Sequence, residues 1–373
     1  AIVLPVAAPL ALDVARRRLS VVSDADGREG AARSPGGGRR VWWPRLSACE
    51  EAPPGRRPVA VVGDVFVDVV ARVQGLPVWD ADTEAEFVKV LPGGSALNQA
   101  RHLHALGAGV LFFGALGADA LGTMLASHVR SQGFSLEHVK VFPELPSSVC
   151  LVLAGPADRA FVSCYSTTDA FSTADLEARS EALLGCGHLH VGGYFNLKGL
   201  QNPEFTALVR RCRAAGMTVS LNTQYDAAES WTGLQGHLRE VLPLVDVLFA
   251  NTVEAEKIAA AVLPEQESFE ALCRAFPGLT LVVTQGKDGC QILRQGKPPL
   301  YVPTTPLETV VDATGAGDAF LAGFLSVWLS FGPGVQAEPG NLHAAAARGH
   351  AAARVCVSRE GACVVPVGLE DLA

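Results

Sequence analysis

The feature that most constrains the fold is a regular alternation of short apolar runs and helical segments from residue 59 onward. Short apolar runs that end in Gly, Asn or Thr are typical of buried strands, and the longer segments between them have helical spacing. Strands that alternate with helices favour a mainly parallel sheet covered by helices on both faces. The predicted strands are 59–63, 110–113, 188–191, 218–221, 245–250, 279–284 and 309–311, and predicted helices include 98–106, 204–215 and 319–331.

One interval departs from this alternation. Residues 149–153 and 160–165 are two strand-like runs on either side of a Gly-Pro-Ala-Asp sequence, which predicts a β-hairpin. A hairpin inserted into an α/β chain often forms a lid over a ligand site. In such sheets ligands bind at the carboxyl ends of the strands, where this chain concentrates its Gly, Asn, Asp and Thr residues.

The distribution of charge divides the chain near residue 58. Residues 1–58 contain ten arginines, no lysine and six acidic residues, for a net charge of +4, whereas the remainder contains 20 basic and 32 acidic residues, for −12. The first segment is also rich in Gly and Pro, and such a composition cannot bury enough apolar surface to order itself. We expect 1–58 to be a disordered extension, with an organelle-targeting peptide (plastid or mitochondrial) as the alternative, and 59–373 to be the folded domain.

Composition excludes several classes of protein. Hydrophobic residues make up 49% and charged residues 18%, which is ample for a large core. The formal net charge of −8 argues against a nucleic-acid partner, and no apolar run approaches the length of a membrane span. The nine cysteines are scattered without a C-x-x-C pair, so they predict neither a disulfide framework nor a zinc ribbon. A reducing, cytoplasmic compartment therefore fits best.

The strongest chemical signal is Asp-Ala-Thr-Gly-Ala-Gly-Asp at 312–318, between the last predicted strand and an apolar helix. Glycines let backbone amides converge, and the start of a helix adds unpaired N–H groups and a positive dipole end. Residues 315–317 are therefore a candidate anion hole for a phosphoryl group. Asp318 is a candidate general base for an attacking hydroxyl. The alternative is that Asp318 only caps the helix electrostatically.

This motif resembles the C-terminal signature of the ribokinase family of carbohydrate kinases, also called the pfkB family. Gly-Gly-Ser-Ala-Leu-Asn-Gln-Ala at 93–100 looks like the N-terminal signature, and Asn-Thr-Val-Glu at 251–254 is similar to the family's N-x-x-E motif. The motifs stand in the family's order, and the resemblance covers about residues 59–366. It implies a three-layer ribokinase-like α/β fold with a mainly parallel central sheet and a small β lid from strands at about 66–92 and 148–166.

The resemblance also implies an ATP-dependent carbohydrate kinase that transfers the γ-phosphate of ATP to a hydroxyl of a small ribose- or fructose-like sugar. Asp318 would be the catalytic base, and the amides of Gly315, Ala316 and Gly317 would form the anion hole. Mg²⁺ and, with less support, K⁺ would be cofactors. The implied contacts are Asp68, Gly94 and Asn98 for the sugar; Asn222, Thr284, Gly286, Gly289 and His350 for the nucleotide; Asn251 and Glu254 for Mg²⁺ through water; and Asp312, Thr314 and Gly361 for K⁺.

Departures from the family pattern leave the substrate open. Ser95 stands where ribokinase usually has Lys, and Phe66 stands two residues before Asp68 where it usually has Asn. A nucleoside kinase is the alternative, with Phe66, Trp79 and Phe87 lining a site for a base. A catalytically silent family member is a further alternative. Val365 replaces a Ser common at the family's potassium site, which weakens the expectation of K⁺.

Three further interpretations rest on single residues or pairs. His350 lies in a helix rich in small residues, where the family covers the adenine, and a packed core histidine is the equal alternative. His188 and His190 share one face of a predicted strand, but no third ligand is evident, so we expect no zinc site. Val152 and Phe161 of the hairpin are candidates for pairing across a homodimer through the lid.

Overall fold

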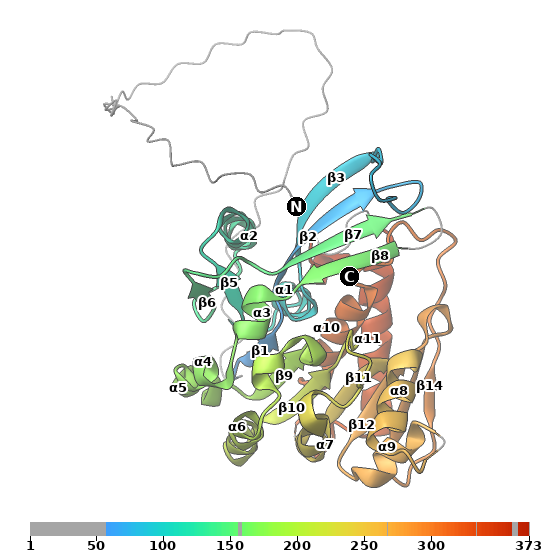
Figure 1. The fold of residues 1–373 in the computed structure, drawn as a ribbon. Coiled ribbons are helices and arrows are strands. Elements are labelled where there is room, and N and C mark those ends of the chain that lie inside the picture. Colours follow the sequence, from blue (N-terminus) through green and yellow to red (C-terminus); the bar gives the residue numbers. More distant parts are fainter. Residues whose placement is uncertain (1–56, 156–158, 267, 333, 360–364, 373) are drawn as a thin grey trace, which may run out of the picture. The chain divides into compact units, whose positions relative to one another are not determined.

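The structure is a computed structural model that describes residues 57–155, 159–266, 268–332, 334–359 and 365–372 (Figure 1). The chain divides into two units, residues 1–45 and 46–373, and every described residue belongs to the second. The expectations for residues 1–56 and for Gly361 therefore lie outside the described residues.

The centre of the fold is an eight-stranded sheet. Its strand order is β14-β13-β12-β11-β10-β9-β1-β4, and the six strands from β12 to β4 run parallel. The two strands at the other edge are antiparallel additions. The bounds are β1 (Val59–Gly63), β4 (Val110–Phe113), β9 (His188–Gly192), β10 (Thr218–Asn222), β11 (Val247–Asn251), β12 (Thr280–Thr284), β13 (Cys290–Arg294) and β14 (Leu300–Val302).

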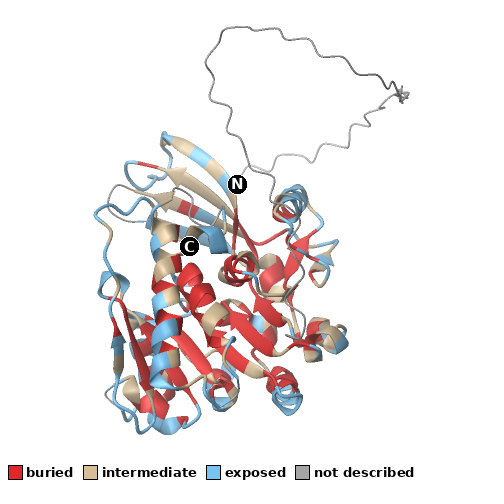
Figure 2. Ribbon diagram, turned by 180° about the vertical axis from the view of Figure 1, so that it is seen from behind, coloured by how far each residue is buried: buried red, intermediate tan, exposed pale blue. Residues whose placement is uncertain are grey.

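Helices cover both faces of this sheet, which confirms the predicted three layers. Alternate residues of β1 enter two separate apolar clusters: Val59 and Val61 pack with one set of helices, and Ala60 and Val62 with the other. Figure 2 shows the strands as a buried layer between the helices. Within the described ranges, no helix has both the length and the apolarity to cross a bilayer. The helices on the face of Val59 and Val61 are α1 (Ser95–Ala105), α2 (Ala120–Ser131), α10 (Ala316–Trp328) and α11 (Pro339–Val357). The helices on the face of Ala60 and Val62 include α4 (Thr173–Glu177), α5 (Ser180–Leu184), α6 (Pro203–Ala214), α7 (Leu238–Val241), α8 (Thr252–Val262) and α9 (Glu270–Ala275). The short helix α3 (Ser166–Ala170) follows the lid.

A second, four-stranded sheet forms the predicted lid. Its order is β3-β2-β7-β8; β2 and β7 are parallel, and the other neighbours are antiparallel. The strands are β2 (Phe66–Arg72), β3 (Phe87–Gly93), β7 (Val149–Ala154) and β8 (Arg159–Cys164), so the predicted hairpin is confirmed. This sheet lies at one end of the main sheet (Figure 1), and a small parallel pair, β5 (Ala115–Gly117) and β6 (Lys140–Phe142), stands apart from it.

The predicted strand at 309–311 is wrong. Val310 and Val311 are each 54% exposed, and the segment has no sheet partner. The Val311 N–H instead donates to the carbonyl of Val357, the last residue of α11, at 2.9 Å. The β-branched sequence has a strand-like propensity, but propensity alone does not make a strand, and this segment pairs with the end of a helix instead. The 312–318 motif therefore follows an irregular segment that the end of α11 holds in place.

The start of α1 leads to a first test, because Gly94 has a backbone conformation that suits only glycine. Its φ is 92°, and a Cβ there would lie 2.6 Å from the carbonyl oxygen of Asp64. Gly216 has a similar φ of 81°, but nothing lies within 4 Å of its Cβ position. We expect Gly216→Ala to lower the free energy of unfolding by about 1–2 kcal/mol from strain alone. Gly94→Ala should cost about 1–3 kcal/mol more, because the clash with backbone adds to the strain.

Urea unfolding of the two variants and the parent protein measures both losses. Equal losses in the free energy of unfolding would show that the close approach of Gly94 to Asp64 adds nothing to the cost of the substitution.

Candidate active site

The predicted polar residues meet at one edge of the main sheet. The parallel register aligns Gly63 of β1 with Gly192 of β9, and Gly192 with Asn222 of β10. Farther along the same edge, Asn251 of β11 is aligned with Thr284 of β12. The carboxyl ends of neighbouring parallel strands therefore place these residues side by side, as expected for a ligand site in such a sheet.

Asp318 lies at the third position of α10 and is only 6% exposed. Its Oδ1 accepts a hydrogen bond from Gln99 Nε2 at 2.8 Å, and its Oδ2 accepts one from Asn98 Nδ2 at 3.4 Å. Gly315, the N-cap residue, has a φ of 76°, and no side chain caps the helix. The carboxyl of Asp318 thus accepts hydrogen bonds from α1, and it also lies in the first turn of α10, as the electrostatic alternative requires.

Three carboxyl groups share this buried region, and burial shifts all of them in the same direction. Burial raises the pKa of Asp318 to about 8, against the opposing bond from Gln99. Burial also raises the pKa of Asp68 to about 7 and that of Asp64 to about 6. Asp64 keeps the lowest pKa of the three while accepting bonds from Ala96 N and Asn196 Nδ2, each at 2.8 Å. A carboxyl group with a pKa near neutrality is suited to accept a proton during catalysis.

The region next to Asp318 contains a buried acceptor without a partner and a further carboxyl group. Asn98 Oδ1 is buried and has no hydrogen-bond partner within the described part of the chain. The carboxyl of Asp68 lies over Gly93, where a Cβ would come within 2.1 Å of Asp68 Oδ1. An unpaired buried acceptor is costly unless a ligand supplies a donor. The acceptors of Asn98 and Asp68 therefore suit a ligand that carries several hydroxyl groups.

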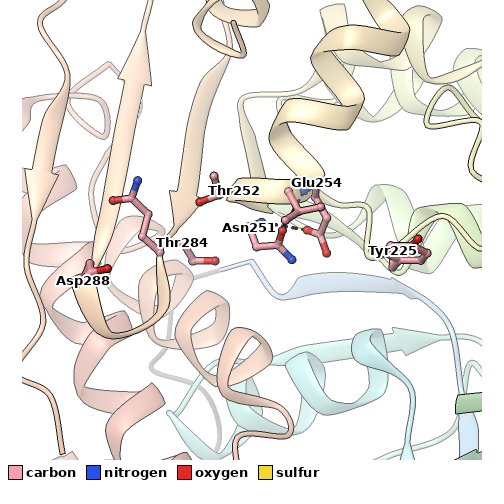
Figure 3. A pocket seen from close by; sticks show the side chains of 8 residues that line it. Tyr225, Asn251, Thr252, Glu254, Thr284 and Asp288 are labelled. Atoms are coloured by element: carbon pink, nitrogen blue, oxygen red, sulfur yellow. Dashed lines mark hydrogen bonds between the residues drawn. The ribbon is translucent and has the colours of Figure 1, made fainter. Parts of the chain in front are cut away.

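A pocket of about 650 Å³ lies beside this region, at the ends of β11 and β12. Asn251 and Glu254 form a reciprocal capping box at the start of α8, with bonds of 2.9 and 3.0 Å between side chain and backbone. Figure 3 shows these two residues facing each other, with Tyr225 on one side and Thr284 and Asp288 on the other. Burial raises the pKa of Glu254. The lining residues are Tyr225, Asn251, Thr252, Val253, Glu254, Thr284, Gln285 and Asp288.

Asn222 lies between the two parts of the site. Its Oδ1 accepts from Gln99 Nε2 at 3.0 Å and from Gln224 Nε2 at 2.8 Å, and its Nδ2 donates to the carbonyl of Phe249 at 3.2 Å. Of the other predicted nucleotide residues, Gly286 begins a short 3₁₀ turn, and Gly289 ends it with a φ of 103°. These positions place Asn222, Gly286 and Gly289 along the same edge as Thr284.

Some predicted residues lie elsewhere. His350 is buried, with Nε2 3.0 Å from the carbonyl of Val302 and its ring centroid 5.0 Å from that of Phe320, which agrees with the core alternative. Phe66 and Phe87 occupy opposite ends of the paired strands β2 and β3, about 20 Å apart at the usual rise per residue. Trp79 is 99% exposed in the loop between those strands. These three aromatic residues therefore do not form one lining in this structure.

The residues proposed for potassium have a lid residue as a neighbour. Asp312 Oδ1 accepts from the N–H of Thr314 at 2.8 Å. Arg159, at the start of β8, contacts the hydroxyl of Thr314 and lies 4.0 Å from Asp312 Oδ1. A guanidinium group thus already shares the carboxylate that a monovalent cation would use. The same contact connects the lid to the loop before α10.

Comparison with known proteins agrees with this geometry. A sequence model of the pfkB family carbohydrate kinases matches residues 56–367. The chain belongs to this family. An ATP-dependent ribose-1-phosphate kinase of Halopiger xanaduensis is 27% identical over 310 residues, which cover 83% of this chain and 94% of the relative. Adenosine kinase 1 of Arabidopsis thaliana is 26% identical over 305 residues, which cover 74% and 86%.

Solved structures show the fold of this pfkB family kinase independently. The structure of Arabidopsis thaliana ribokinase complexed with ribose and ATP matches with a TM-score of 0.70 at 23% identity, covering 85% of this chain and 97% of the other. This likeness confirms the ribokinase-like fold with its lid. The family match identifies the chain as a phosphotransferase with an alcohol group as acceptor.

Sequence reasoning overlooked three residues that the structure brings into the site. Gln99 lies inside the N-terminal signature, but only the packing of α1 against α10 shows that it contacts Asp318. Asp64 directly follows β1, a position that marks it as a candidate for the strand-end site. Arg159 is placed by the lid register, which no local signal in the sequence reveals.

The raised pKa values generate a prediction about stability. A carboxyl group with a higher pKa in the folded state binds protons more tightly there, so its contribution to stability decreases as pH rises from about 4 to about 8. Asp318→Asn removes the group with the largest shift among Asp64, Asp68 and Asp318. The quantity to compare is the melting temperature of the variant minus that of the parent. We expect this difference to be more positive at about pH 8 than at about pH 5, by about 2 °C or more.

Thermal unfolding at the two pH values measures this difference. Glu177→Gln, which replaces an exposed carboxylate paired with Arg211, is the matched control and should show no such difference. If Asp318→Asn behaves like this control, the folded protein does not hold a proton on Asp318.

Proposed function

We propose that this pfkB family kinase transfers the γ-phosphate of ATP to a hydroxyl of a small sugar that resembles ribose or fructose. The observation that carries the proposal is the buried carboxyl of Asp318 at the start of α10, beside the unpaired Asn98 Oδ1. Phosphoryl transfer to an alcohol requires a base, a group that accepts a hydrogen bond from the alcohol, and N–H groups that stabilise the phosphoryl oxygens, all within one site.

The residues suggest the following division of work. One sugar hydroxyl would donate to Asn98 Oδ1 and others to Asp68, so that the reacting hydroxyl faces Asp318. Its oxygen would attack the γ-phosphorus while its proton passes to the carboxylate of Asp318, and the bond from the γ-phosphorus to the bridging oxygen of ADP would break. The N–H groups of residues 315–317 would stabilise the charge on the phosphoryl oxygens.

Mg²⁺ and K⁺ fit the chain to different degrees. Glu254 and Asn251 supply the oxygen ligands that Mg²⁺ prefers, at the edge of the nucleotide pocket, so they would hold the ion through its waters. Bound there, Mg²⁺ neutralises phosphate charge. For K⁺, the carboxylate of Asp312 is shared with Arg159, so Asp312 and Thr314 fit a monovalent cation only in part.

The lid favours a sugar over a nucleoside. Asp68, Cys150 and Ser163 lie opposite one another on β2, β7 and β8, so they form one polar row on the face of Asp68. Such a row offers hydrogen bonds to the hydroxyl groups of a sugar. Because Phe66, Trp79 and Phe87 lie apart, the base site required by the nucleoside alternative is not assembled in this structure.

A panel of acceptors tests this proposal. ADP release is measured with ribose, fructose, ribose 1-phosphate and adenosine, and we expect turnover with a sugar and a much slower rate with adenosine. Asp318→Asn should lower kcat by about 10²- to 10⁴-fold, because the base is lost, while ATP still raises the melting temperature. Faster turnover of adenosine would favour a nucleoside kinase. ATP binding without turnover on any acceptor would favour the catalytically silent alternative.

We also propose that two copies of the chain associate through the lid. The face of the lid opposite Asp68 carries one apolar residue from each strand in a continuous row: Val90, Val69, Leu151 and Val162. Val90, Leu151 and Val162 are 43%, 41% and 58% exposed. A row that crosses a whole sheet suits a self-complementary contact between two copies. Val152 and Phe161, the other candidates for such a contact, lie on the face of Asp68, where Val152 is 7% and Phe161 58% exposed.

Light scattering tests the dimer. We expect a dimeric mass for the parent protein, and a monomeric mass for Leu151→Asp, because a charge in the centre of the row would have to be buried unpaired. Val141→Asp introduces the same charge at an exposed residue of β6, outside the lid, and should leave the mass unchanged. A monomeric parent protein at working concentration would contradict the proposal.

A further inference from the structure

The interior of the main sheet contains a polar seam that the proposed mechanism does not use. On the face covered by α1 and α10, the neighbouring strands β1 and β11 contribute apolar residues such as Val61 and Val247. The two middle strands of the parallel part, β9 and β10, instead contribute polar residues to this face. They are His188, His190, Thr218 and Ser220.

These residues form one chain of hydrogen bonds that ends at Asp318. Thr218 Oγ1 lies 2.7 Å from His188 Nδ1, and His188 Nε2 lies 2.7 Å from Ser220 Oγ. Ser220 Oγ is in turn 2.7 Å from His190 Nδ1, and His190 Nε2 is 2.8 Å from Gln99 Oε1. Gln99 Nε2 then reaches Asp318 Oδ1 at 2.8 Å and Asn222 Oδ1 at 3.0 Å.

The chemistry of the groups gives this chain a single direction. The amide nitrogen of Gln99 must face the two oxygens of Asp318 and Asn222, so its Oε1 faces His190 and can only accept. His190 therefore carries its proton on Nε2 and accepts on Nδ1 from the hydroxyl of Ser220. That hydroxyl has one proton, so it must accept from His188 Nε2–H, which leaves His188 Nδ1 to accept from Thr218.

Burial keeps both histidines neutral, as this direction requires. Gln99, His190 and Ser220 are fully buried, and His188 is 2% exposed. Burial lowers the pKa of His190 to about 3 and the pKa of His188 well below its usual value. Burying these polar side chains on β9 and β10 costs desolvation free energy. Because every member of the chain has hydrogen-bond partners, the chain is also rigid.

We propose that Gln99 is a positioning residue for Asp318, and that the chain His190–Ser220–His188–Thr218 fixes the orientation of its amide. A rotated amide would place Gln99 Oε1 against the oxygens of Asp318 and Asn222 and its amine against the N–H of His190. The contact of Gln99 Oε1 with Asn222 Oδ1 is repulsive because Asn222 Nδ2 is held by the carbonyl of Phe249, and the contact with His190 is repulsive too; the contact with Asp318 is repulsive when its carboxyl is ionised. The chain therefore ensures that the base always meets a hydrogen-bond donor. The proposal rests on the proposed role of Asp318 as the base, but its first test does not.

The first test reads the histidine tautomers directly. Nuclear magnetic resonance of protein labelled with ¹⁵N-histidine distinguishes the two neutral tautomers and the protonated form. His188→Gln and His190→Gln assign the two signals. We expect both histidines to remain in the Nε2–H tautomer from about pH 5 to about pH 9. An Nδ1–H tautomer, or titration of either ring within this range, would overturn the chain.

The second test reads the carboxyl group of Asp318, again without a substrate. Carboxyl-labelled aspartate gives the titration midpoint, and Asp318→Asn identifies the signal. Gln99→Leu should move the midpoint upward by about one pH unit, because the carboxylate loses a donor. His190→Phe keeps an aromatic ring of similar size and should move it in the same direction by less. The other titratable groups facing Asp318, which are Asp64 and Cys356, are the same in every variant.

A matched control separates positioning from stability. His237 is also a buried histidine with two partners, the hydroxyls of Tyr194 and Thr206 at 2.7 and 2.8 Å, but it lies in the apolar cluster on the other face of the sheet. His237→Phe should lower the melting temperature as His190→Phe does and leave the midpoint of Asp318 unchanged. If Gln99→Leu also leaves the midpoint unchanged, Gln99 does not position the base.

A kinetic measurement links the chain to turnover. With the acceptor that gives the highest rate in the panel, the acid limb of kcat against pH should move upward in Gln99→Leu and His190→Phe, with KM changed less than about twofold. An unchanged limb would overturn the positioning role. If no acceptor is turned over, the proposed function fails, whereas the tautomers and the carboxyl midpoint still decide whether the chain exists.

Discussion

The contact on which the site depends is the pair of hydrogen bonds between the carboxyl of Asp318 on α10 and the side chains of Asn98 and Gln99 on α1. It joins two signatures that are more than 200 residues apart in the sequence, and it forms only when both helices pack on the same face of the sheet. No side chain caps α10, and of its first amides Ala316 N–H donates to the carbonyl of Ala313 at a long 3.4 Å, so the start of the helix can still offer N–H groups where the carboxyl is held. Fold and chemistry thus depend on the same helix pair.

Burial of this contact has two opposing effects. It removes the carboxyl from water, which raises its pKa and lowers stability at neutral pH. It also makes the group a stronger base and strengthens every hydrogen bond around it, because the local dielectric constant is low. Unpaired Asn98 Oδ1 belongs to the same pattern. A site with such unmet requirements is less stable without ligand than a fully paired core, and a hydroxyl-rich ligand would relieve that cost.

The sequence predicted the alternation of strands and helices, the lid hairpin and the residues of the three motifs because glycine turns and apolar runs are local signals. It did not predict β13 and β14, since an antiparallel edge added to a parallel sheet depends on which strand has a free neighbour. It misplaced a strand at 309–311, because the backbone of that segment pairs with the end of α11, a contact with no local signal. The structure places Val152 and Phe161 opposite each other on the face of the lid that carries Asp68, a placement that the sequence could not give because a shift of one residue in register reverses the face. The hydrogen-bond partners of His188 and His190 come from another strand and a helix, so the sequence could not reveal them. The spacing of the two histidines raised only the question of a zinc site, for which no third ligand was evident.

Net charge is a poor guide to what this site binds, and the pKa values show why. Asp64, Asp68 and Asp318 lie in one buried region, and three full negative charges there would repel a triphosphate. Burial raises the pKa of Asp318 to about 8 and that of Asp68 to about 7, so protons offset part of the negative charge of the ligand-free site at neutral pH, and the ionised fraction of Asp318 is the form that can act as a base. The amides at the start of α10 add positive partial charge at the same place. An acidic domain can therefore hold an anion, because the local arrangement of dipoles and protons decides the field at the site.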